Sequence, residues 1–257
     1  MAFALDPALA AALVPSDESA QARAVEPTTR GDALALRAAI DADADLAFAA
    51  LPVFEEVTTA SHVIDVVDGR IEMRWYTTAG VQPGPAVVYV RGGGLIGGTL
   101  DNYEPSIKLL VDLTGVPFLH VGYRLAPEHR GTTPAADALA GIRWLLDHCA
   151  DLGVEPSRVA VMGDSGGGAV AAGAAILARD EGIELARQIL VYPMLDDRNV
   201  EPDPRLVEFA TWTYDNNFTG WKRVAGRPAR WRRRARGRGT GPSGGVRRSR
   251  AEVRRGG

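Results

Sequence analysis

The segment 163–167, Gly-Asp-Ser-Gly-Gly, separates a run typical of a β-strand from a run typical of a helix. The run before it, 158–162, is short and apolar, and the run after it, 169–179, is rich in alanine and leucine. Gly-x-Ser-x-Gly in this position is typical of a nucleophile elbow, a tight turn that projects the serine hydroxyl from the end of the strand. The segment therefore predicts Ser165 as a nucleophile, although an ordinary strand–turn–helix corner shares the pattern.

Chymotrypsin-like proteases also carry Gly-Asp-Ser-Gly-Gly around their serine, and His148-Cys149 is similar to their His-Cys pair. Only sixteen residues lie between His148 and Ser165, whereas that fold places the two residues on separate β-barrels. A helix after the serine is also wrong for an all-β protease. His148 belongs instead to an amphipathic helical run, 141–149.

A second glycine-rich segment follows an apolar run, 86–90, that is typical of a buried strand. Three consecutive glycines at 92–94 allow the backbone to approach a ligand with its N–H groups. A phosphate-binding loop is excluded because the Gly-Lys-Ser/Thr ending is absent. A flexible turn is the alternative interpretation.

Together these motifs resemble the hormone-sensitive-lipase-like branch of the α/β-hydrolases, which are bacterial carboxylesterases and lipases. The resemblance covers about residues 4–221 and rests on four segments in the family's order: 92–94, 123–129 (Tyr-Arg-Leu-Ala-Pro-Glu-His), 163–167 and 190–196 (Leu-Val-Tyr-Pro-Met-Leu-Asp). It implies hydrolysis of a small-molecule ester through an acyl-serine intermediate on Ser165, with no metal or organic cofactor. The implied oxyanion hole consists of the backbone N–H groups of Gly93, Gly94 and Gly166.

Arg91 departs from this family pattern, which has histidine at the same place. The family's histidine supports the glycine loop and does not belong to the catalytic triad. Two outcomes stay open: Arg91 bonds to carbonyl groups of the loop, or it distorts the oxyanion hole.

The alternation of strand-like and helix-like runs predicts an α/β fold, with a mostly parallel sheet between helices. The expected strands are 61–67, 71–78, 86–90, 117–123, 159–162 and 188–192, and the expected helices are 7–13, 31–48, 102–114, 135–150 and 166–179. The resemblance implies an antiparallel start to the sheet and an N-terminal helical cap. We therefore divide the chain into a cap segment (1–55), an incomplete α/β-hydrolase core (56–221) and a basic tail (222–257).

The net charge of -3 conceals a sharp change near residue 222. Residues 222–257 hold Lys222 and thirteen arginines against Glu252, a net charge of +13, which leaves -16 for residues 1–221. Such a tail binds nucleic acid or an anionic surface, forms a disordered extension, or results from a shifted reading frame in a GC-rich gene. We favour the shifted frame, because the tail replaces the family's last two core strands. A nucleic-acid partner is the less favoured interpretation.

Ser165 has no histidine after it in the sequence. His62, His120, His129 and His148 all precede it, whereas the family order is Ser…Asp…His. Asp196, Asp197, Asp203 and Asp215 follow the serine but have no histidine to orient. We therefore expect the triad acid and histidine to be missing and the esterase activity to be low or absent. The alternative functions are a non-catalytic acyl-ligand binder and an anion-binding tail.

Three further expectations concern the setting of this chain. Its single cysteine, Cys149, excludes an intramolecular disulfide. No apolar run reaches the ~18 residues of a membrane span, and the first residues lack a basic signal-peptide region, so we expect a cytoplasmic protein. The strand 188–192 should lie at a sheet edge, where the family-type dimer contact is lost.

Overall fold

The computed structural model describes residues 6–8, 28–80, 83–199, 201–207 and 210–225. All of them belong to one structural unit, residues 1–227; the second unit, 228–257, lies outside the described residues. Most of the expected basic tail and most of the expected helix 7–13 therefore also lie outside them.

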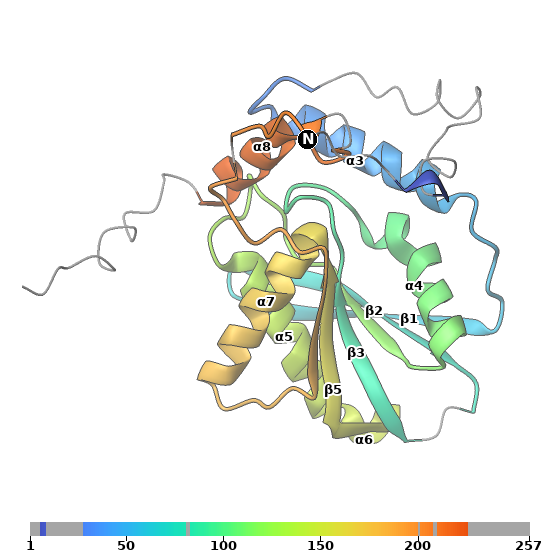
Figure 1. Cartoon of the computed structure of the whole chain (residues 1–257). Helices are drawn as coiled ribbons and strands as arrows, with labels where there is room; N and C mark the ends of the chain where they lie inside the picture. The colour runs from blue at the N-terminus through green and yellow to red at the C-terminus, as the bar shows by residue number, and fades with distance from the viewer. Residues whose placement is uncertain (1–5, 9–27, 81–82, 200, 208–209, 226–257) are drawn as a thin grey trace, which may run out of the picture. The chain divides into compact units, whose positions relative to one another are not determined.

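A mixed sheet of six strands forms the centre of this unit (Figure 1). The strands are β1 (Val57–Val66), β2 (Gly69–Thr78), β3 (Gly84–Val90), β4 (Phe118–Val121), β5 (Val154–Asp164) and β6 (Arg187–Val191). Their order across the sheet is β1-β2-β4-β3-β5-β6. Strands β1 and β2 form an antiparallel hairpin and β2 is antiparallel to β4, whereas β4, β3, β5 and β6 run parallel. The predicted α/β fold with an antiparallel start is thus confirmed.

The described part of the chain includes the helices α3 (Ala33–Phe48), α4 (Leu100–Thr114), α5 (Thr133–Asp147), α6 (Cys149–Leu152), α7 (Ser165–Asp180) and α8 (Tyr214–Ala225). The ends of α4 show why the sequence folds locally as predicted. The Thr99 hydroxyl accepts a hydrogen bond from Asn102 N at 3.0 Å, and the Asn102 side chain accepts one from Thr99 N at 3.1 Å. The helix ends at Gly115, whose φ of 66° suits glycine.

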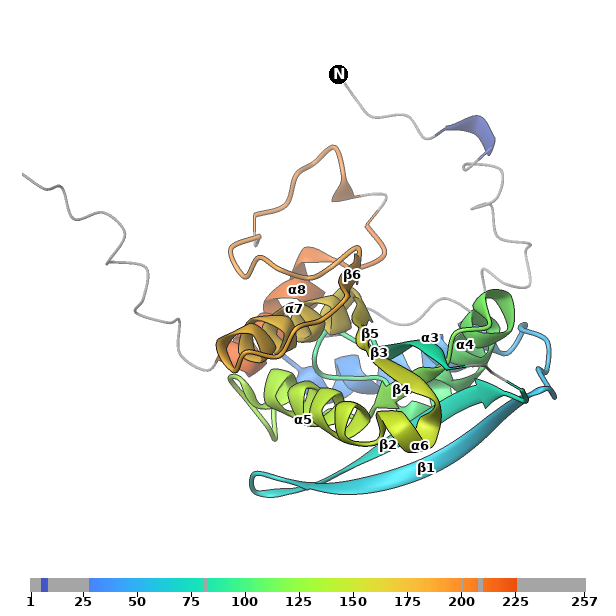
Figure 2. The ribbon, with the colours of Figure 1, turned by 90° about the horizontal axis from the view of Figure 1, so that it is seen from below.

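Helices cover both faces of the sheet, with α5 and α7 on one face and α4 on the other (Figure 2). Side chains alternate between the two faces along a strand. Val88 and Val90 of β3 therefore pack in the core beneath α5 and α7, whereas Val87 and Tyr89 pack with Tyr103 of α4. This double burial explains why the run 86–90 is apolar throughout.

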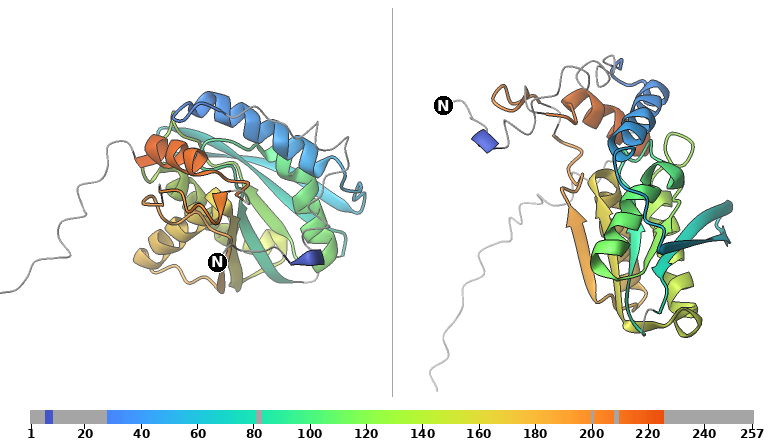
Figure 3. Two further views of the ribbon diagram at one scale, coloured as in Figure 1. Left: turned by 45° about the horizontal axis from the view of Figure 1, so that its top comes forward. Right: turned by 90° about the vertical axis from the view of Figure 1, so that its right-hand side faces the viewer.

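Helices α3 and α8 lie side by side at the end of the unit where β3 and β5 finish (Figure 3). The backbone N–H of Gly31, before α3, donates to the Thr219 hydroxyl of α8 at 2.8 Å. Arg223 of α8 also donates to the carbonyl of Gly31. Helix α3 near the N-terminus therefore packs with the last helix of the described chain.

Helix α8 crosses the boundary that the sequence predicts between core and tail. Helix α8 continues to Ala225, four residues beyond 221, with Val224 buried and its carbonyl accepting from Gly131 N at 3.0 Å. These first residues of the expected tail are thus part of the folded unit.

Strand β6 is an edge strand within the described chain, as predicted. Its residues Arg187, Gln188 and Ile189 are exposed.

Candidate active site

Ser165 occupies the turn between β5 and α7, as the sequence predicts for a nucleophile elbow. Its φ is 51°, in the left-handed region that residues other than glycine rarely adopt. The side chain is half-buried, and the carbonyl accepts a hydrogen bond from Met194 N at 2.8 Å. Ser165 therefore combines a strained backbone with partial access to solvent, as the nucleophile of an elbow requires.

The glycines on either side of Ser165 are sterically required. A Cβ on Gly163 would lie 2.3 Å from the carbonyl oxygen of Gly167, and a Cβ on Gly167 would lie 2.1 Å from that of Val90. Because real Cβ atoms do not approach oxygens this closely, α7 can fold back on β5 and β3 only with glycine at both positions.

The glycine loop after β3 lies directly against the elbow. Gly93 and Gly94 have φ values of 101° and 58°, and the Gly93 carbonyl accepts from Ile96 N and Gly97 N at 3.0 and 2.9 Å. A Cβ on Gly166 would lie 2.8 Å from the backbone nitrogen of Gly94. The structure thus places the backbone nitrogen of Gly94 beside Gly166 at the start of α7, where helical N–H groups lack intrahelical partners.

Asp164 connects these two segments, a role that the sequence analysis did not identify. Its carboxylate accepts hydrogen bonds from the Tyr89 hydroxyl and from Gly92 N, the latter at 3.1 Å. Burial raises the pKa of Asp164 above its ordinary value, although these hydrogen bonds oppose the shift. The position of Asp164 next to Ser165 was visible in the sequence, but its partners lie more than 70 residues away.

The tyrosines around this site remain protonated at neutral pH. Burial raises the pKa of Tyr123 to about 12 and raises those of Tyr89 and Tyr103 as well. A phenol with so high a pKa is a poor general base near pH 7. These groups therefore serve as hydrogen-bond donors, as Tyr89 does toward Asp164.

Among the described residues, no hydrogen bond joins the Ser165 hydroxyl to an imidazole. His120 is fully buried in β4, which β3 separates from β5, and burial holds its pKa well below the ordinary value. His62 lies in β1, and burial also lowers its pKa. His148 Nδ1 is 2.7 Å from the Trp144 carbonyl, and His129 precedes α5. Each of these histidines thus lies in a segment other than the turn that carries Ser165.

The acidic residues that follow Ser165 have other partners. Hydrogen bonds from Arg205 lower the pKa of Asp203 to about 2, and Asp197 is exposed. The ion pairs are Asp196–Arg198 at 2.7 Å, Asp203–Arg205 at 2.6 Å and Asp215–Arg30 at 3.3 Å. Each of these three carboxylates is thus paired with an arginine.

Arg91 is buried at the base of the glycine loop, with 4 % of its surface exposed. Its guanidinium stacks on the Tyr123 ring, 4.5 Å from the centroid. The Nε and Nη1 atoms find no hydrogen-bond partner among the residues that the structure describes. These atoms therefore make no bond to loop carbonyls. The loop carbonyl of Arg91 instead accepts from the Tyr123 hydroxyl at 2.9 Å.

The segment that leads into α8 covers the glycine loop. A Cβ on Gly94 would lie 2.3 Å from the indole ring of Trp212, and a Cβ on Gly220 would lie 2.8 Å from the Gly94 carbonyl. Trp212 and α8 therefore form a wall of the site, which local sequence patterns gave no means to predict.

Within the part of the chain that the structure describes, no group of three His, Cys, Asp or Glu side chains is placed to hold a metal ion. None of the described helices is long and apolar enough to cross a membrane.

Part of this chain is similar to known esterases. The chain is 40% identical over 115 residues to ethyl acetate hydrolase of Pseudomonas putida, covering 44% of this chain and 36% of that protein. It is 44% identical over 110 residues to carboxylesterase NlhH of Mycobacterium tuberculosis, covering 42% and 34%. The chain thus spans about a third of the length of these curated relatives.

Solved structures show the same fold. A bacterial heroin esterase superposes with a TM-score of 0.72 at 32% identity, covering 86% of this chain and 68% of that one. A hyperthermophilic esterase from Pyrobaculum calidifontis gives a TM-score of 0.71 at 28% identity, covering 86% and 71%. A family model described as alpha/beta hydrolase fold matches residues 87–236, more than half of the chain. The chain therefore belongs to the alpha/beta hydrolase fold family.

Proposed function

We propose that this chain carries the nucleophile and the oxyanion donors of a serine carboxylic-ester hydrolase, without the base that makes such a serine efficient. The observation that carries the proposal is the contact between the elbow and the glycine loop, with Ser165 at φ 51° beside Gly166 and Gly94. The esterase names of the relatives support the same reaction class.

The proposed reaction begins when Ser165 Oγ attacks the carbonyl carbon of an ester. The carbonyl oxygen takes the negative charge, and the backbone N–H groups of Gly93, Gly94 and Gly166 stabilise it. The carbon–oxygen bond to the alcohol then breaks, the alcohol leaves with a proton, and an acyl-serine remains. Water attacks the acyl-serine, which releases the carboxylic acid and restores the serine hydroxyl. Short-to-medium acyl esters are the proposed substrates.

The proton of Ser165 has no imidazole to accept it, so water must take it. A neutral serine hydroxyl is a weak nucleophile without an adjacent base. In subtilisin, loss of the triad histidine reduces turnover by about 10⁶. The oxyanion donors and substrate binding still leave a rate about 10³–10⁴ above that in water.

Labelling with a fluorophosphonate probe followed by peptide mass spectrometry tests this proposal. We expect slow labelling confined to Ser165, faster labelling when free imidazole is added as an external base, and none in Ser165→Ala. A chain that binds acyl ligands without catalysis would give no label at Ser165 even with imidazole. Such a result, or equal labelling of Ser165→Ala, would contradict the proposal.

A further inference from the structure

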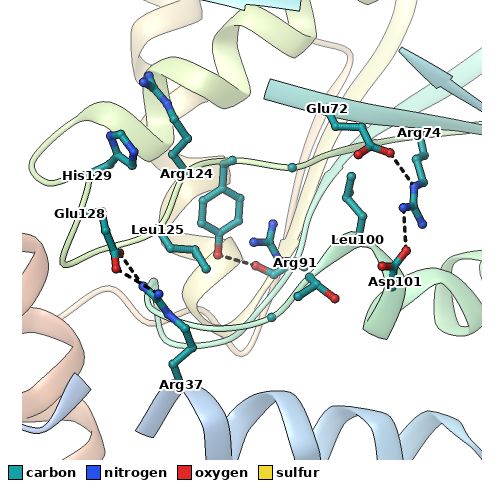
Figure 4. Close-up of a pocket in the computed structure, with 14 residues that line it drawn as sticks. Arg37, Glu72, Arg74, Arg91, Leu100, Asp101, Arg124, Leu125, Glu128 and His129 are labelled. Carbon is teal, nitrogen blue, oxygen red and sulfur yellow. Dashed lines mark hydrogen bonds and ion pairs between the residues drawn. The ribbon is translucent and has the colours of Figure 1, made fainter. Parts of the chain in front are cut away.

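A pocket of about 440 Å³ lies apart from the elbow, between β2, the glycine loop and the segment after β4. Arg91 of the glycine loop, Leu100 of α4 and Leu125 line it, and Ser165 does not (Figure 4). A pocket of this volume is large enough for a small organic molecule.

Four arginines and three carboxylates line this pocket, and three of the arginines form ion pairs. Figure 4 shows two of these arginines joined to carboxylates by dashed lines. The pairs are Arg37–Glu128 at 2.6 Å and Arg124–Asp137 at 2.8 Å, and Arg74 pairs with Asp101, Glu72 and Glu104 at 2.6, 3.0 and 3.0 Å. Arg91 is the lining arginine for which the described residues supply no such ion pair.

The guanidinium of Arg91 is buried. A buried guanidinium without a partner is costly, because neither water nor a carboxylate replaces its lost hydration. Arg91 Nε and Nη1 lack hydrogen-bond partners among the described residues, although the Tyr123 ring stacks on the guanidinium. An anion in the pocket would supply the missing partner.

The start of α4 adds to the positive potential at Arg91. Gly98, Thr99 and Leu100 line the pocket at the N-terminus of this 15-residue helix, where backbone dipoles favour a negative charge. A Cβ on Gly98 would lie 3.1 Å from Arg91 Nε. Glycine at this position therefore lets the helix start approach the guanidinium closely.

We propose that this pocket binds a small monocarboxylate, with its carboxylate on the guanidinium of Arg91 and its hydrocarbon part against Leu100 and Leu125. The carboxylate would supply a hydrogen-bond acceptor to a guanidinium nitrogen of Arg91 that has none among the described residues. A planar carboxylate also matches the planar guanidinium, which can donate two parallel hydrogen bonds. The apolar side chains favour an acid with a short hydrocarbon chain over an inorganic anion.

Thermal unfolding of the full chain in butyrate tests this site, with sodium chloride added to keep ionic strength constant. A ligand that binds only the folded state raises Tm in a saturable way, and we expect a rise of about 2–4 °C. Arg91→Met should remove the rise. Arg143→Met should keep it, because Arg143 is an exposed arginine paired with Glu181 outside the pocket. An equal rise in wild type and Arg91→Met, as binding near Ser165 would give, overturns the proposal.

A measurement on the unmodified chain covers the case in which Arg91→Met does not fold. Saturation-transfer NMR compares butyrate with butyramide, its uncharged analogue of similar shape. We expect transfer to butyrate that is at least five-fold stronger, and competition by acetate but not by chloride. Equal transfer to both compounds, or none to butyrate, overturns the proposal.

Discussion

The carboxylate of Asp164 accepts a hydrogen bond from the backbone N–H of Gly92 at 3.1 Å, which joins the residue before the nucleophile to the glycine loop. Gly92 has no room for a side chain at this contact, since a Cβ would lie 2.5 Å from the Asp164 carboxylate. The Asp164 carboxylate therefore holds the two segments of the proposed oxyanion hole to each other, which makes Asp164 a positioning residue.

The raised pKa of Asp164 predicts a pH dependence of stability. The folded state binds the proton of this carboxyl more tightly than the unfolded state, whose pKa is about 3.9. The resulting stabilisation is complete below the unfolded pKa and is lost as pH rises through the folded pKa. The free energy of unfolding of wild type, minus that of Asp164→Asn, should therefore fall as pH rises above about 4.

Urea unfolding at a series of pH values measures this difference. Asp180→Asn is the matched control, because Asp180 is an exposed carboxylate paired with Arg179. The difference in free energy of unfolding between wild type and Asp180→Asn should not fall in this way as pH rises. A difference for Asp164→Asn that grows with pH would mean that the folded state favours the charged carboxylate.

Gly167→Ala should destabilise the chain by about 3 kcal/mol or more, because its Cβ would lie 2.1 Å from the Val90 carbonyl oxygen. Gly115→Ala separates this clash from backbone strain: φ there is 66°, but no atom lies within 4 Å of the added Cβ. Strain alone should cost about 1 kcal/mol. Equal losses for the two variants in urea unfolding would show that the elbow tolerates a side chain at Gly167.

The exposed edge of β6 should make the chain self-associate. Among the described residues β6 is an edge strand, and its Ile189 has 39% of its surface exposed. An unpaired apolar edge is a template for further strands. Ile189→Lys should lower the concentration-dependent increase in light scattering. Ile176→Lys changes an isoleucine that is 51% exposed on α7, away from a sheet edge, and should have little effect. Equal effects would point to general surface hydrophobicity as the cause.

Local patterns were sufficient to predict much of the fold and part of the site. The strand before Ser165, the helix after it and the glycines at 163 and 167 follow from steric demands within a few residues. Strand β3, which leads into the glycine loop, was also predicted from local sequence, because a strand buried on both faces consists of apolar residues throughout.

Contacts between distant segments could not be predicted in this way. Gly92 N donates a hydrogen bond to the Asp164 carboxylate, 72 residues later, and Gly31 N donates one to the Thr219 hydroxyl, 188 residues later. The burial of Arg91 was also missed, because an arginine in a loop is ordinarily exposed. The burial of Val224, which follows the basic residues Lys222 and Arg223, likewise depends on contacts with distant segments.

Steady-state hydrolysis of p-nitrophenyl butyrate by this chain, compared with Ser165→Ala, tests the central claim most directly. A typical enzyme turnover of ~10 s⁻¹, reduced by about 10⁶ for the missing base, predicts a rate on the order of 10⁻⁵ s⁻¹. The account therefore predicts a rate for the chain barely above that of Ser165→Ala. A turnover above about 1 s⁻¹ that disappears in Ser165→Ala would contradict it, because a proton acceptor must then reach the serine.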